Sequence, residues 1–264
     1  MNLSEYTKLA DLMAKIEASD NQVDDLFWKP LTEAKDIEAF DNKISVVNDS
    51  QSWPRKLNWK KGRVLEDLCE FIFNRFYDVD VKKNKRPGDN ETDIETVIGE
   101  KPKPPFMQSI IGQKIICECK NKKSTPIDVG NVSKLAEILP TRGSKFGIFI
   151  SILGITGSGW RYGEGKRKKI MCKHEIPLIS FTVKELEVLR EGYNFYTMIK
   201  NKYNALLDEV DDDTGDIPEN THIEYTKRVS EFLNHLNKCE LINQIEFSNL
   251  RDRVVKRYGE IFEE

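Results

Sequence analysis

The sequence lacks the features that mark membrane-spanning, exported and disulfide-stabilised proteins. No apolar run approaches the ~18 residues that a membrane-spanning helix requires. The N-terminus has no cationic start followed by an apolar block, so we predict no signal peptide. The five cysteines are an odd number without framework spacing, and no C-x-x-C motif occurs, so we expect neither disulfides nor a zinc site. These absences predict a cytoplasmic protein with no membrane partner.

Histidine is also scarce, and the net charge of the whole chain is close to zero. The three histidines show no metal-ligand spacing, so we interpret them as structural or surface residues. The 264 residues carry 41 basic and 44 acidic side chains, a net charge of −3 that on its own argues against a nucleic-acid partner. Hydrophobic residues make up 39% of the chain, which is typical of a globular protein with a sizeable core.

The charge is unevenly distributed along the chain. Residues 1–54 carry 5 basic and 11 acidic side chains, residues 55–173 carry 25 and 14, and residues 174–264 carry 11 and 19. The net charges of these segments are therefore −6, +11 and −8. A basic centre of this kind is either a solvated lysine-rich surface or a surface that attracts phosphates, and charge alone favours the first.

Hydrophobic periodicity predicts a central α/β core between two helical flanks. We expect residues 1–55 to form an acidic helical segment, residues 56–191 the core, and residues 192–264 an acidic helical region. Residues 19–54 are interrupted by prolines and predict one or two short helices. The other predicted helices are 1–18, 61–77, 129–139, 182–191, 193–209, 223–239 and 246–262, with Asp128 and Thr182 as N-caps, and the predicted strands are 79–83, 92–98, 113–120, 146–151 and 176–181.

The most informative segment is the predicted strand Ile115-Ile-Cys-Glu-Cys-Lys120. Because side chains alternate faces along a strand, Cys117 and Cys119 point into a core, whereas Glu118 and Lys120 share the opposite face. A carboxylate can hold a hard cation such as Mg²⁺, and an adjacent ammonium can orient or deprotonate a water and stabilise negative charge. Taken alone, a Glu-x-Lys pattern is more often an ordinary surface pair.

Asp93 is a candidate for the same site because it opens the preceding predicted strand. If the two strands pair, Asp93 lies beside Glu118, and a shared cation relieves the repulsion between the two carboxylates. Local hydrogen bonding at the start of the strand is the ordinary explanation for Asp93. Asp89 and Glu95 compete with it, but Asp89 suits a turn and Glu95 lies deeper in the strand.

Glu66 is the fourth candidate, at the margin of the apolar stripe of the predicted helix 61–77. From this position it can lean over the edge of the sheet toward a cation. The alternative is an exposed glutamate of a helix, paired with Arg63.

Three short motifs therefore occur in order along the chain. They are Gly62-Arg-Val-Leu-Glu66, Gly88-Asp-Asn-Glu-Thr-Asp93 and Glu118-Cys-Lys120. They resemble the G-x-x-x-E, G-D-x-x-x-D and E-x-K elements of PD-(D/E)xK nucleases, most closely those of the Mrr-type restriction endonucleases, over about residues 58–190. The chain departs from the family in the proline-rich insert 101–105, in Asn90 and Glu91 where a second glycine is usual, and in Glu118 where many Mrr-like proteins have glutamine.

The resemblance implies a three-layer α/β core, with a mixed central sheet flanked by helices, and helical additions at both ends. It implies an endonuclease that hydrolyses DNA phosphodiester bonds with Mg²⁺, or Mn²⁺ in its place. By position, Asp93, Glu118 and the Cys119 carbonyl would bind the metal, Lys120 would activate the attacking water, and Glu66 would bind the metal or position the water indirectly. A role in restriction or anti-phage defence follows from the same resemblance, as a homodimer or as a subunit of a defence complex.

The basic centre then has a use in binding DNA phosphates around the cleavage site. The side chains predicted to do this are Lys83, Lys85, Arg86, Lys122, Lys123, Arg161, Lys166, Arg167, Lys168 and Lys169. Two other functions stay open at this point. One is a structure-specific or repair nuclease of the same fold, such as a junction resolvase, and the other is a non-catalytic subunit that binds nucleic acid or a partner protein.

Overall fold

The computed structural model describes residues 7, 23–85, 91–157, 162–210 and 223–259. The first predicted helix, 1–18, therefore lies outside the described residues except for Thr7. In the described part of the chain, no helix combines the length and the apolar character that crossing a membrane requires.

A five-stranded mixed sheet forms the centre of the fold, in the order β1-β2-β3-β4-β5. The first three strands are antiparallel neighbours, and the last two continue from β3 in parallel. The predicted mixed sheet is thus confirmed. The strands are β1 (Val79–Lys85), β2 (Thr92–Ile98), β3 (Lys114–Lys120), β4 (Phe146–Ser151) and β5 (Leu178–Thr182).

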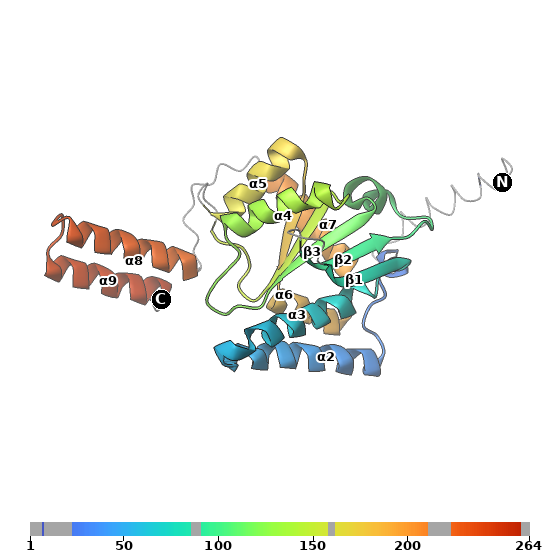
Figure 1. The fold of residues 1–264 in the computed structure, drawn as a ribbon, viewed down its shortest axis with the longest axis horizontal. Helices are drawn as coiled ribbons and strands as arrows, with labels where there is room; N and C mark the ends of the chain where they lie inside the picture. The colour runs from blue at the N-terminus through green and yellow to red at the C-terminus, as the bar shows by residue number, and fades with distance from the viewer. Residues whose placement is uncertain (1–6, 8–22, 86–90, 158–161, 211–222, 260–264) are drawn as a thin grey trace.

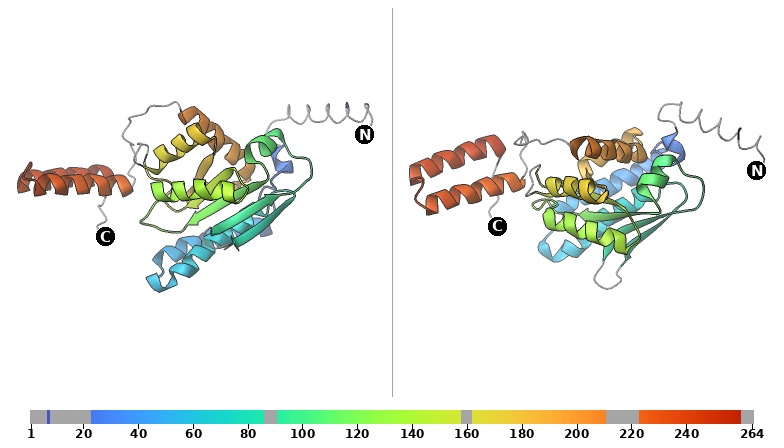
Figure 2. Two further views of the ribbon diagram at one scale, coloured as in Figure 1. Left: turned by 45° about the horizontal axis from the view of Figure 1, so that its top comes forward. Right: turned by 90° about the horizontal axis from the view of Figure 1, so that it is seen from above.

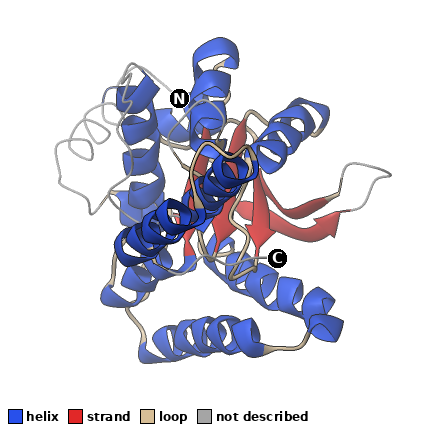
Figure 3. Cartoon of the chain, turned by 90° about the vertical axis from the view of Figure 1, so that its left-hand side faces the viewer, coloured by secondary structure: helices blue, strands red, loops and turns tan. Residues whose placement is uncertain are grey.

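Helices cover both faces of this sheet, which gives the three-layer α/β architecture expected from the sequence (Figure 1). One face packs on α3 (Asn58–Phe73), with α2 (Ala34–Asp49) against α3. The other face packs on α4 (Val129–Thr141) and α5 (Gly163–His174). α7 (Phe195–Val210) contacts β5 and α5. Figure 2 shows this arrangement from two further sides, and Figure 3 shows the strands between the two groups of helices.

The alternation of β3 is visible in the two hydrophobic clusters. Ile115 and Cys117 belong to the cluster on the α3 side, and Ile116 belongs to the cluster on the α4 side. The period of two predicted from the sequence is therefore the period that the sheet uses.

Both predicted N-caps are present. The Asp128 side chain accepts a hydrogen bond from the backbone N–H of Asn131 at the start of α4. Thr182 and Glu185 form a reciprocal capping box at the start of α6 (Val183–Leu186), which a short 3₁₀ helix (Glu187–Glu191) continues.

Two of the differences between the structure and the sequence prediction concern the segments before α3 and after β2. Where one or two short helices were predicted, residues 34–49 form one helix of 16 residues, because Phe40, Ile44 and Val47 recur at helical spacing and are buried. After the proline-rich insert, Met107–Ile111 forms a π-helical turn where no helix was predicted.

The predicted boundaries at residues 55 and 191 do not coincide with gaps in the packing. Trp28 and Phe40 from the N-terminal side and Phe195 from the C-terminal side share one hydrophobic cluster with residues of α3 and the sheet. Beyond α7, α8 (Ile223–Lys238) and α9 (Gln244–Tyr258) form a helical hairpin of their own.

Candidate active site

The amino end of β2 and the carboxyl end of β3 meet at one edge of the sheet. Ile94 pairs with Cys117 in this antiparallel ladder, so Asp93 and Glu118 come next along the two strands. The backbone N–H of Cys119 donates a hydrogen bond of 2.7 Å to Asp93 Oδ2. The structure therefore brings together the two carboxylates that the sequence singled out, through one antiparallel pairing and one hydrogen bond.

Glu118 is almost fully buried, on the face of the sheet that α4 covers. Its side chain is 7% exposed, and its Oε1 atom is buried without a hydrogen-bond partner among the described residues. Burial, together with the neighbouring charge of Asp93, raises the pKa of Glu118 to about 7. A buried carboxylate oxygen without a hydrogen-bond donor destabilises the fold, and a bound cation would remove this free-energy cost.

Asp93 is partly buried and lies in the field of the same group of charges. Burial raises its pKa, while the Cys119 N–H and the charges of Lys120 and Lys134 oppose this increase. Asp93 and Glu118 are thus two neighbouring carboxylates whose pKa values are both raised, and together they form an oxygen-rich set of donors. This donor set fits a hard divalent cation such as Mg²⁺.

Lys120 is the last residue of β3 and faces the same charges. Its ammonium lowers the pKa of Asp93, of Glu118 and of Asp128 at the start of α4, so it lies close to all three carboxyls. An ammonium fixed at a strand end next to two metal-binding carboxylates can orient a water and stabilise a developing negative charge.

Glu66 reaches the same edge from α3. Its Oε2 accepts hydrogen bonds from Arg63 Nη1 at 2.9 Å and from Asn84 Nδ2 at 2.8 Å. Burial raises the pKa of Glu66 to about 7, and the charge of Asp93 contributes. The alternative of an exposed glutamate is wrong, because Glu66 is buried, but the expected ion pair with Arg63 is present. Glu66 also lies within the field of Asp93.

Comparison with known proteins finds a family model that matches the part of the chain that carries this site. Residues 57–179 match the family model of the Mrr catalytic domain, which is described as a restriction endonuclease. The matched range includes the four residues Glu66, Asp93, Glu118 and Lys120. Residues 57–179 form a restriction-endonuclease domain of the Mrr type. No curated protein and no solved structure matched the chain.

The end of β3 in this nuclease domain is fixed by a network that the sequence did not reveal. Asn121 follows Lys120 and is 6% exposed. Its Nδ2 donates to Lys61 O at 2.6 Å and to Ser50 Oγ at 3.0 Å, and its Oδ1 accepts from Gln51 Nε2. Residues 50 and 51, which precede the matched range, therefore help to hold the end of β3 against α3.

Three of the basic residues predicted to bind DNA are exposed near this site or on α5. Lys122 and Lys123 are exposed directly after β3, and Lys123 lies near Lys61, whose pKa is lowered by burial and by this like charge. Lys169 is exposed on α5, whereas Lys166 and Lys168 are partly buried there.

Two other predicted DNA contacts are engaged within the fold. Lys83 Nζ forms ion pairs with Asp67 at 2.6 Å and Glu70 at 2.7 Å, so its charge is locally neutralised. Arg167 is 7% exposed and pairs with Glu164 at 2.6 Å, which corrects its assignment as a DNA contact because it faces the interior. Arg86, Arg161 and the side chain of Lys85 lie outside the described residues.

The competing carboxylates are accounted for separately. Glu95 is fully buried and forms an ion pair with Arg142 and a 3.0 Å hydrogen bond with Thr92, so it serves the fold on the α4 side. Asp89, together with Gly88 and Asn90 of the second motif, lies outside the described residues.

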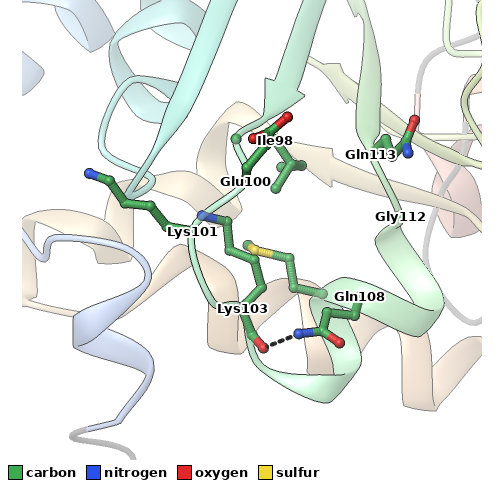
Figure 4. A pocket seen from close by; sticks show the side chains of 9 residues that line it. Ile98, Glu100, Lys101, Lys103, Gln108, Gly112 and Gln113 are labelled. Atoms are coloured by element: carbon green, nitrogen blue, oxygen red, sulfur yellow. Dashed lines mark hydrogen bonds between the residues drawn. The ribbon is translucent and has the colours of Figure 1, made fainter. Parts of the chain in front are cut away.

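A pocket of about 300 Å³ lies at the opposite edge of the sheet, where β2 ends and β3 begins (Figure 4). Ile98, Lys103 and Gln113 are among the residues that line it, and Gln108 Nε2 donates to the Lys103 carbonyl at 2.7 Å. None of the predicted catalytic residues lines this pocket, and the proline-rich insert forms part of its wall.

Proposed function

We propose that the chain is a metal-dependent DNA endonuclease, with Mg²⁺ as its cofactor and Mn²⁺ as an alternative. The observation that carries this proposal is the buried Glu118 Oε1, which has no hydrogen-bond partner among the described residues and lies beside Asp93 and Lys120. The match to the restriction-endonuclease family supports DNA as the substrate.

In the proposed mechanism, Asp93, Glu118 and the backbone carbonyl of Cys119 hold the metal. A divalent ion at this position supplies Lewis-acid stabilisation of the phosphate charge. The Cys119 N–H holds one oxygen of Asp93 against β3, the strand that carries Glu118. Lys120 Nζ donates a hydrogen bond that orients the attacking water and stabilises the negative charge that develops on the phosphate.

Glu66 acts from α3 as a positioning residue in this proposal. Arg63 and Asn84 both donate hydrogen bonds to Oε2 of Glu66. In this proposal the other oxygen, Oε1, is the one that acts on the water or the metal's ligands. We assign to Glu66 the placement of the water or of the metal's outer ligands. Its ion pair with Arg63 also limits the negative charge that the edge of the sheet presents to DNA.

Lys122, Lys123 and the lysines of α5 supply the surface that attracts DNA phosphates. Their contacts would be largely independent of base sequence, because they go to the backbone of the duplex. We propose restriction or anti-phage defence as the role, with a homodimer or a defence complex as the working assembly, since two cuts in a duplex favour two-fold symmetry.

The test is incubation of supercoiled plasmid with the full chain in Mg²⁺ or Mn²⁺, with a chelator as the control. We expect nicked and linear products with either cation and none with the chelator. The D93A variant is expected to be inactive with both cations. Cleavage that persists in the chelator, or that D93A retains at the wild-type rate, would contradict the proposed site.

A further inference from the structure

Three cysteine sulfurs meet behind the catalytic strand, on the α3 side of the sheet. Cys69 lies on α3, and Cys117 and Cys119 lie on β3. Their Sγ atoms all lie within 4.8 Å of one another, and those of Cys69 and Cys119 are 3.3 Å apart. Cys69 and Cys117 are 0% exposed.

The fold explains why this cluster is invisible as a sequence motif. Cys117 and Cys119 share one face of β3 because the period of a strand is two. Cys69 joins them from the buried stripe of α3, nearly 50 residues earlier, so no C-x-x-C spacing arises. A single buried cysteine is an ordinary small apolar side chain. Three sulfurs within 4.8 Å of one another, next to the hydrophobic cluster of α3 and the sheet, form a preassembled set of soft ligands.

We propose that Cys69, Cys117 and Cys119 form a three-thiolate site for a soft d¹⁰ cation, with Cu⁺ preferred over Zn²⁺. Thiolates select Cu⁺ and Zn²⁺ among the common metals. Structural zinc takes four ligands, but only three candidate ligand atoms converge here within the part of the chain that the structure describes. Cys69 and Cys117 are completely buried, so a water could approach the three sulfurs only from the side of the partly exposed Cys119.

The spacing of the sulfurs suits three-coordinate binding. Metal–sulfur bonds of about 2.3 Å in a trigonal plane place the sulfurs about 4 Å apart. The three Sγ atoms already lie within 4.8 Å of one another, and the 3.3 Å contact between Cys69 and Cys119 has to open only slightly. Cys119 is the partly exposed member of the three, so we expect rotation of its side chain to open this contact.

Cys119 belongs to both sites, which gives the soft site a structural consequence. Its backbone N–H binds Asp93 on one side, and its sulfur joins the cluster on the other. A cation held by the three thiolates would cross-link β3, which bears Glu118, to α3, which bears Glu66. This inference does not depend on the proposed nuclease function, because metal binding can be measured without DNA.

The test uses the full chain carrying C172S and C239S, which removes the two exposed thiols. The reduced, metal-free protein is titrated anaerobically with Cu⁺ in competition with a chromophoric Cu⁺ chelator, and a parallel titration uses Zn²⁺. We expect one Cu⁺ to bind per chain, and Zn²⁺ to bind more weakly than Cu⁺. Adding C69A or C117A should weaken Cu⁺ binding at least 100-fold.

Three results would overturn the proposal. The first is no Cu⁺ binding by the C172S/C239S protein, which needs no substitution in the core. The second is wild-type affinity in a C69A or C117A protein whose circular dichroism shows it to be folded. The third is Zn²⁺ binding as tight as Cu⁺ binding, which would overturn the assigned preference and point to a fourth ligand.

Discussion

The backbone N–H of Cys119 donates a 2.7 Å hydrogen bond to the carboxylate of Asp93. This bond joins the start of β2 to the strand that carries Glu118 and Lys120. It fixes one oxygen of Asp93, so that the second oxygen is available to a cation. The backbone pairing of β2 with β3 and this hydrogen bond therefore set the relative positions of the residues in the proposed active site.

Replacing Glu118 by glutamine is expected to stabilise the metal-free protein at high pH while abolishing cleavage. The folded pKa of Glu118, about 7, exceeds its ordinary value of 4.5. Its proton is therefore held more tightly in the folded state, and stability falls as pH rises from about 4.5 through 7. The penalty is on the order of 3 kcal/mol above pH 7.

Urea unfolding in chelator at pH 5.5 and pH 8 measures this effect. The unfolding free energy of E118Q minus that of wild type should be larger at pH 8 than at pH 5.5. The exposed, distant Glu240 provides the control, and E240Q should show no such difference. If E118Q is instead less stable relative to wild type at pH 8 than at pH 5.5, the pKa of Glu118 is not raised in the folded protein.

Affinity for the divalent cation should rise steeply with pH around neutrality. Protons on Glu118 and Glu66, both with a pKa of about 7, compete with the metal at lower pH. Mn²⁺ binding followed by electron paramagnetic resonance is expected to strengthen about 10-fold or more from pH 6 to pH 8. In the E66Q variant the affinity for Mn²⁺ should change less with pH than in wild type. A wild-type affinity that does not change with pH would argue against metal binding at Glu118.

Asn121 is expected to position Lys120 through its contacts with Ser50, Gln51 and the Lys61 carbonyl. N121A should lower kcat about 10-fold with little change in KM for DNA, and should cost about 1–3 kcal/mol of stability because it leaves buried partners unpaired. N121D, which keeps the shape but loses the donor, should not restore kcat. Exposed Asn201 is the matched control, and a purely structural role would leave the kcat of folded N121A unchanged.

Lys122 and Lys123 should contribute to DNA affinity in a salt-dependent way. Removing both charges should reduce the slope of log affinity against log salt by about 1.8, because each phosphate contact contributes about 0.9. Fluorescence anisotropy in Ca²⁺ over a range of salt concentrations measures this slope. The double variant K29A/K101A removes two exposed charges elsewhere and should leave the slope unchanged, so an equal effect of both variants would refute a localised DNA surface.

The sequence was sufficient for features that depend on local periodicity. β2 and β4 have the predicted bounds, Asp128 and Thr182 cap helices as expected, and the alternation of β3 puts Glu118 and Cys117 on opposite faces. These properties depend on neighbouring residues, so a pattern of two or 3.6 residues captures them.

Features that depend on tertiary proximity were not predictable in this way. The network of Asn121 joins residues 60 to 71 positions apart, and the cysteine cluster joins α3 to β3. The burial of Arg167 depends on how α5 packs, since its neighbours in sequence are all basic. No local pattern separates a lysine that faces DNA from one such as Lys83 that pairs with Asp67.

Single-turnover cleavage by the K120A variant, at saturating Mg²⁺ and with Mn²⁺ binding measured on the same protein, tests the central claim most directly. Lys120 stabilises charge only in the reaction, so we predict cleavage at least about 100-fold slower than wild type with metal affinity largely retained. Cleavage by K120A at the wild-type rate would contradict the assignment of Lys120, and with it the account of Asp93, Glu118 and Lys120 as one active site.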